Sequence, residues 1–89
     1  MSVEIDLKAC SILERLSAEL TESAVDYTCT QDLHQFMVTT GGVTREIGFA
    51  ERVLEVTNIP DIEQVVNKLI HQIKAGTAPQ RIRVHTRAA

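Results

Sequence analysis

A Gly-Gly pair at positions 41 and 42 is the sequence feature that most constrains the fold. It stands between two runs, 33–40 and 43–50, in which apolar and polar residues largely alternate. Both central positions of a type I′ turn require positive φ, which glycine adopts without steric cost, so the pair predicts a two-residue β-hairpin. Counting back from this turn places Phe36 opposite Ile47.

Residues 24–30 also alternate and predict a strand before this hairpin. If Gln31 and Asp32 form another two-residue loop, Tyr27 lies opposite Phe36. The two registers then converge on one apolar and one polar face of a three-stranded meander. The apolar face contains Val25, Tyr27, Phe36, Val38, Ile47 and Phe49. The polar face contains Asp26, Thr28, Gln35, Met37, Thr39, Thr44 and Glu46.

Two amphipathic helices flank the meander. Apolar residues recur at spacings of three and four over 4–22, which predicts a helix; the alternative is a strand over 3–7 and a helix that starts at a Ser11-x-x-Glu14 capping box. A second helix is expected after Asn58, with Pro60 in its first turn, and ends near Gly76. Residues 50–57 predict a short helical turn, or alternatively an extended continuation of the third strand.

The closing residues 81–86 alternate again and predict an edge strand or an extended arm. The expected fold is therefore α+β: a three-stranded antiparallel meander with two amphipathic helices on one face, in the order α-β-β-β-α, plus a C-terminal strand or arm. Residues 1–76 are expected to form a single domain, and residues 77–89 the basic strand or arm.

The size of the chain favours self-association. It has 89 residues, 44% of them hydrophobic and 24% charged, which is typical of one soluble domain. Such a small domain hides only about 60–65% of the surface that its unfolded chain exposes, so its core is thin. A homo-oligomer, most simply a homodimer, would enlarge that core.

Cysteine usage and hydropathy predict a cytoplasmic protein. Two cysteines are too few for a disulfide framework, and the N-terminal residues lack the basic and apolar regions of a signal peptide. No apolar run approaches the roughly 20 residues that a membrane-spanning helix needs. The spacing of cysteine and histidine fits no zinc motif, and we expect no metal or other cofactor.

Catalytic chemistry has little support in the sequence. The register places Cys29 opposite His34, and the structural interpretation is a buried thiol beside a partly buried imidazole. The acidic residues fall mostly on polar faces, where a solvated surface accounts for them better than an acid–base pair. A non-enzymatic protein is therefore favoured over an enzyme.

Basic residues concentrate at the C-terminal end, since residues 64–89 carry five basic residues and no acidic one. Candidate contacts to a partner or to nucleic acid are Arg81, Arg83, His85 and Arg87. Nucleic acid is not favoured, because all three aromatic residues are assigned to the core and none is left for base stacking.

The order helix, meander, helix resembles that of double-stranded-RNA-binding domains, but the resemblance stops at topology. Those domains carry a lysine-rich cluster at the start of the second helix, where this chain has Asn58, Pro60, Asp61 and Glu63. The departure removes the phosphate contacts, and fold order alone does not imply function.

The leading functional hypothesis is a homodimeric protein-interaction module. Its candidate binding surfaces are the C-terminal arm and the open face of the sheet, with Gln35, Met37, Thr39, Thr44 and Glu46. The alternatives are a nucleic-acid-binding protein that uses the basic strand, and a small ligand-binding protein or enzyme with its pocket between helices and sheet or at a dimer interface.

Overall fold

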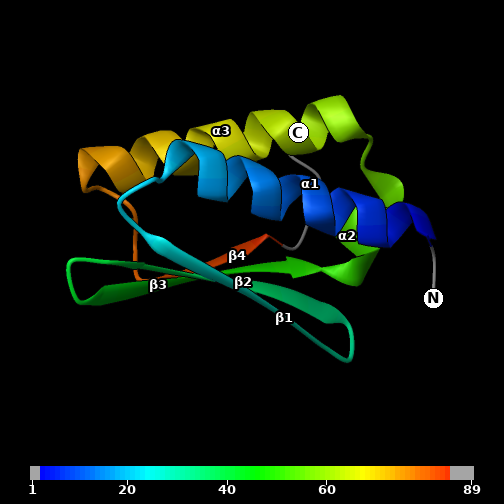
Figure 1. Ribbon diagram of the computed structural model, residues 1–89. Coiled ribbons are helices and arrows are strands. Elements are labelled where there is room, and N and C mark those ends of the chain that lie inside the picture. Colours follow the sequence, from blue (N-terminus) through cyan, green and yellow to red (C-terminus); the bar gives the residue numbers. More distant parts are fainter. Residues whose placement is uncertain (1–2, 85–89) are drawn as a thin grey trace.

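Four strands form one mixed sheet, and three helices cover one face of it (Figure 1). The computed structural model describes residues 3–84. The elements are α1 (Val3–Glu19), β1 (Ala24–Thr30), β2 (Leu33–Thr40), β3 (Val43–Ala50), α2 (Glu51–Val56), α3 (Ile59–Ala75) and β4 (Arg81–Val84). The strand order is β1-β2-β3-β4; β1, β2 and β3 are antiparallel neighbours, and β4 runs parallel to β3.

Both two-residue hairpins are confirmed, together with their registers. Gly41 and Gly42 have φ of 56° and 82°, as a type I′ turn requires, and Phe36 pairs with Ile47. In the first hairpin Tyr27 pairs with Phe36. That turn holds Gln31 at a φ of 49°, in the left-handed region that non-glycine residues rarely adopt.

The α+β class is confirmed, but the three-stranded sheet is corrected to a four-stranded mixed one. Residues 81–84 form β4 within the same sheet, with Ile82 opposite Ile47. A parallel neighbour requires a long crossover connection, and α2 and α3 supply it by carrying the chain back along the helical layer. The alternation of residues 81–86 predicts a strand, but it contains no information on the partner of that strand.

The helices follow the sequence signals closely. Residues 3–7 belong to α1, so the alternative that makes them a strand is wrong. The short helical turn is confirmed as α2. At the start of α3, the side chain of Asn58 accepts a hydrogen bond from the backbone N–H of Asp61 at 3.0 Å. The helix ends at Gly76, whose φ is 75°.

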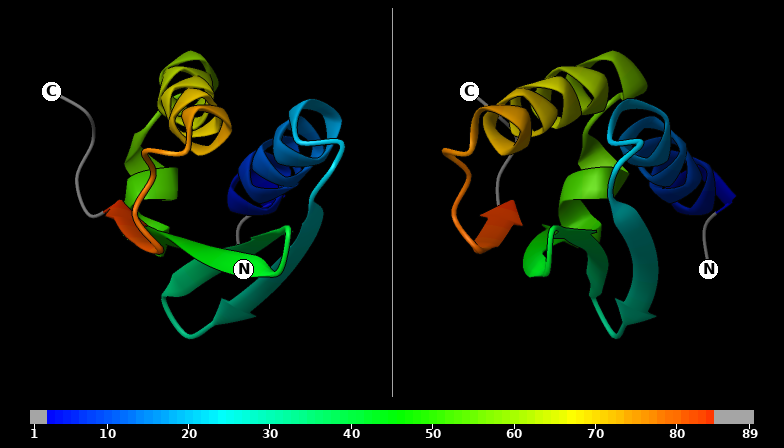
Figure 2. Two further views of the ribbon diagram at one scale, coloured as in Figure 1. Left: turned by 90° about the vertical axis from the view of Figure 1, so that its left-hand side faces the viewer. Right: turned by 60° about the vertical axis from the view of Figure 1, so that its left-hand side comes forward.

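The core lies between the helices and the sheet. Figure 2 shows all three helices on one side, with α1 above the β1 side of the sheet and α3 above the β4 side. Phe36, Val38, Ile47 and Leu54 are completely buried. The placement of Tyr27 in the core is wrong: its ring is on the helix-facing side but is 36% exposed, because β1 is the edge strand.

None of the helices within residues 3–84 combines the length and the apolar character that crossing a membrane requires.

Candidate functional site

The open face of the sheet carries the five side chains that the sequence places there. Register puts Gln35, Met37, Thr39, Thr44 and Glu46 on the side opposite the helices, where the described part of the chain covers the sheet with no other element (Figure 2). The Thr39 and Thr44 hydroxyls lie 3.0 Å apart across the hairpin. The Gln35 amide donates to a Glu46 carboxylate oxygen at 2.5 Å. The face is therefore a hydrogen-bonded polar surface.

The basic residues of β4 lie on this same face and are engaged by Glu46. Its carboxylate oxygens are 3.6 Å from Arg81 Nε and 3.0 Å from Arg83 Nη1. The Arg83 side chain crosses Gly48, where an added Cβ would come within 2.5 Å of Nη1. One carboxylate thus partly neutralises two of the arginines proposed to contact phosphate, which weakens the case for nucleic acid. His85 and Arg87 lie outside the described residues.

The outer edge of β1 is open: within residues 3–84, β1 pairs only with β2. Six of its seven residues are exposed. A two-residue turn closes on a hydrogen-bonded pair, here Thr30 and Leu33, and such pairs alternate along an antiparallel ladder. The backbone N–H and C=O groups of Val25, Tyr27 and Cys29 consequently point away from β2.

The two edges of the sheet differ in how they are protected against pairing. β4 is only four residues long, follows Pro79 closely and carries two arginines, and these features discourage a further strand from adding. β1 is seven residues long, contains no proline, lysine or arginine, and has Asp26 as its single charged residue. The edge of β1 is therefore the one suited to receive another strand.

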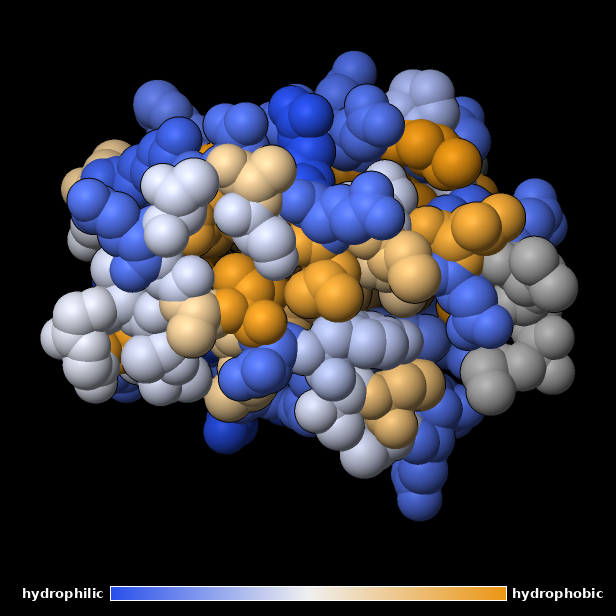
Figure 3. Space-filling view, in the orientation of Figure 1, coloured by the Kyte–Doolittle hydropathy of each residue, from blue (hydrophilic) through white to orange (hydrophobic). Residues whose placement is uncertain are grey.

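Apolar surface accompanies this edge. Leu13 on α1 and Val25 on β1 are only partly buried, and Tyr27 beside them is 36% exposed. Figure 3 shows hydrophobic residues gathered at the surface along the seam between α1 and β1. A strand added to β1 would bring its own side chains next to this seam. The sequence shows that residues 24–30 contain no proline, lysine or arginine, but that this strand is an edge and that α1 lies beside it follow only from the tertiary structure.

A cluster of polar side chains surrounds His34, which is 1% exposed. Its Nδ1 lies 2.6 Å from the Tyr27 hydroxyl, and its Nε2 lies 3.4 Å from Glu51 Oε1 and 3.9 Å from Cys29 Sγ. Cys29 and His34 thus meet as the register predicts. Their burial is the reverse of the expectation, because Glu51 at the start of α2 covers the imidazole while the thiol lies on the exposed edge strand.

The hydrogen bonds of His34 disfavour a nucleophile–base role. Partial burial, followed by the nearby Cys29 thiol, raises the pKa of Tyr27 to about 12, so its hydroxyl, 2.6 Å from Nδ1, keeps its proton at neutral pH. Nε2 faces the Glu51 carboxylate, which can only accept a hydrogen bond, so we assign the ring proton to Nε2 and leave Nδ1 as the acceptor for the Tyr27 hydroxyl. A base for Cys29 would need a free lone pair on that same nitrogen. The cluster holds the β1–β2 hairpin against α2.

This arrangement predicts a loss of stability at high pH. The folded pKa of Tyr27 is about 12 against 10.0 for the free side chain, so the folded state retains the proton more strongly. The contribution of the protonated Tyr27 hydroxyl to the free energy of unfolding is complete below pH 10 and disappears as the pH rises through 12. Because the ring is partly exposed, we expect a decrease of about 1 kcal/mol in the free energy of unfolding. Urea denaturation at pH 9, 10.5 and 12 measures it, and the decrease should be smaller in Tyr27→Phe; an equal decrease would assign it to other groups.

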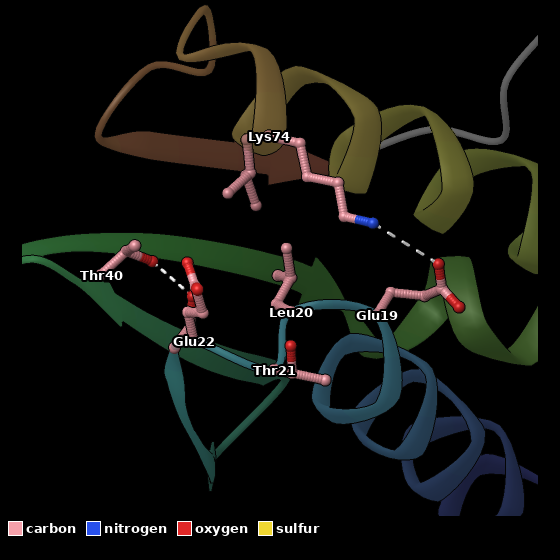
Figure 4. A pocket seen from close by; sticks show the side chains of 8 residues that line it. Glu19, Leu20, Thr21, Glu22, Thr40 and Lys74 are labelled. Atoms are coloured by element: carbon pink, nitrogen blue, oxygen red, sulfur yellow. Dashed lines mark hydrogen bonds and ion pairs between the residues drawn. The ribbon is translucent and has the colours of Figure 1, made fainter.

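A pocket of about 390 Å³ lies where α1 and α3 end beside the β2–β3 hairpin (Figure 4). Lys74 Nζ is 3.7 Å from Glu19 Oε1, and the Ser23 and Thr40 hydroxyls are 2.5 Å apart. Much of the polar lining is therefore paired within the protein.

Within residues 3–84, no group of three or more histidine, cysteine, aspartate or glutamate side chains comes together to hold a metal ion.

Comparison with known proteins adds no relative: no protein-family model matches the chain, and no curated protein matches its sequence.

Proposed function

We propose that the protein is a homodimeric protein-interaction module in which the β1 strands of two copies pair antiparallel across a two-fold axis. The observation that carries this proposal is the open edge of β1, seven residues long and without the protective features of β4. Pairing there would join the two four-stranded sheets into one.

The side chains of β1 favour a two-fold axis at Tyr27. This register pairs the whole strand, placing Asp26 opposite Thr28 and Val25 opposite Cys29 of the second copy. An axis at Asp26 would instead oppose two aspartates, which is destabilising. With the axis at Tyr27, the outward N–H and C=O groups of both strands meet, and each hydrogen bond contributes about 0.5–1.5 kcal/mol.

Self-pairing would also bury apolar surface that the thin core of this small domain leaves partly exposed. The partly buried Leu13 and Val25 would gain cover from the second copy, and apolar area removed from water contributes about 25 cal/mol per Å². The two open faces would become continuous and present Gln35, Met37 and Glu46 twice in one broad surface. That surface is the one we propose for binding another protein.

Disulfide trapping tests the dimer and its register together. In a Cys10→Ser background, Val25→Cys should form a covalent dimer with the native Cys29 of the second copy, because opposed residues of this kind have Cα atoms about 5.5 Å apart. Within one chain the two cysteines would be about 13 Å apart along the strand, so they cannot bridge.

The matched control is Asp26→Cys in the same background, which lies opposite Thr28 and should cross-link far more slowly. Light scattering after size exclusion of the unmodified chain should give the dimer mass. A monomer mass at tens of micromolar, or equal cross-linking of the two cysteine variants, would refute the proposal.

A further inference from the structure

A second pocket, of about 450 Å³, lies where the first turns of α1 meet the link between α2 and α3. Its volume is within the roughly 300–1,000 Å³ of small-molecule sites. None of its lining residues belongs to β1, so what it binds is independent of self-association.

Lys8 lines this pocket and is 7% exposed. Its ammonium group donates one hydrogen bond, to the Leu54 carbonyl oxygen at 2.7 Å. Among residues 3–84 no carboxylate oxygen lies within 4.0 Å of it. An ammonium group has three N–H donors, and a buried cation without a counter-ion is costly. The pocket therefore contains a positive charge that lacks an anionic partner.

Thr57 and the N-terminus of α3 lie beside Lys8 at the same pocket. Thr57 lines the pocket at 3% exposure, and its Oγ1 has no hydrogen-bond partner in the part of the chain that the structure describes. The N-terminus of α3 also borders the pocket, where Asn58 caps Asp61 and the helix dipole favours negative charge. Buried polar groups are normally satisfied, so the single hydrogen bond of the Lys8 ammonium group points to a ligand.

The remaining lining defines the kind of anion. Val56 and Ile59 are 54% and 45% exposed, and they offer apolar contact beside the charged end. Glu4 and Glu55 are exposed at the same pocket and would repel a dianion more strongly than a monoanion. We infer that the pocket binds a small monocarboxylate with a short aliphatic chain, its carboxylate at Lys8 and its chain on Val56 and Ile59.

Titration of the full ¹⁵N-labelled chain with sodium hexanoate tests this inference, with sodium chloride holding the ionic strength constant. We expect saturable shifts of the amide signals of residues 4–8 and 54–61. Acetate should bind at least tenfold more weakly, because it lacks the four CH₂ groups that hexanoate would bury on Val56 and Ile59. Phosphate, which is largely dianionic above pH 7, should produce no saturable shift.

Lys8→Met should weaken hexanoate binding at least tenfold, as expected when a hydrogen bond to a charged group is lost. The control is Lys68→Met, which removes an exposed lysine of α3 and should bind as the parent does. If Lys8→Met fails to fold, Ile59→Ser decides, since it should abolish the preference for hexanoate over acetate. Equal binding in the lysine variants, binding of phosphate as tight as hexanoate, or no saturable shift would overturn the inference.

Discussion

Replacing Phe36 with alanine is expected to lower the free energy of unfolding by about 3–5 kcal/mol. Phe36 is completely buried at the middle of β2. Its ring meets Phe49 edge-on at a centroid distance of 5.9 Å and Tyr27 at 5.0 Å. Truncation leaves a cavity beneath the helices and removes both aromatic contacts. The free energy of unfolding of an 89-residue domain is roughly 5–13 kcal/mol in total, so Phe36→Ala would remove much of it.

Urea denaturation followed by circular dichroism measures this loss, at one fixed protein concentration because a dimer's stability depends on concentration. The matched control is Tyr27→Phe, which keeps the ring at the exposed edge and removes only its hydroxyl, with an expected cost of about 1 kcal/mol. A decrease below 1 kcal/mol for Phe36→Ala would contradict the packing described for the centre of the sheet.

A proline at Cys29 is expected to convert the dimer into a folded monomer, whereas a proline at the adjacent Thr28 should destabilise the fold of the chain itself. The N–H of Cys29 points out of the sheet, so its loss leaves the β1–β2 ladder intact but removes a bond to the second copy. The N–H of Thr28 points toward β2, and its loss costs a ladder bond within the chain. We expect Thr28→Pro to lower the free energy of unfolding by about 2–3 kcal/mol.

Light scattering and circular dichroism distinguish the two variants. Cys29→Pro should show half the parent mass with an unchanged spectrum, and Cys29→Ala, which keeps the backbone N–H, should remain a dimer. If Cys29→Pro kept the dimer mass, the copies would be joined elsewhere, and the open face of the sheet would be the next surface to test.

The open face of the candidate site was predictable from the sequence. Once Gly41 and Gly42 reverse the chain in two residues, alternation assigns Gln35 and Met37 to one face and Phe36 to the other. The engagement of Arg81 and Arg83 by Glu46 was not predictable in the same way. It depends on β4 lying beside β3, and the helices that bring it there separate the two strands by 30 residues of sequence.

The sequence by itself determined the helices, the hairpins and the two faces of the meander, because turn chemistry and periodicity act between residues close in the chain. Only the tertiary structure decided which edge of the sheet stays open, which histidine is covered and which lysine is buried. Those outcomes depend on contacts between distant segments: α2 places Glu51 over His34, and α1 directs Lys8 to the carbonyl of Leu54. Periodicity treats Lys8 as one more polar residue of α1, and only the packing of α2 against that helix buries most of its side chain.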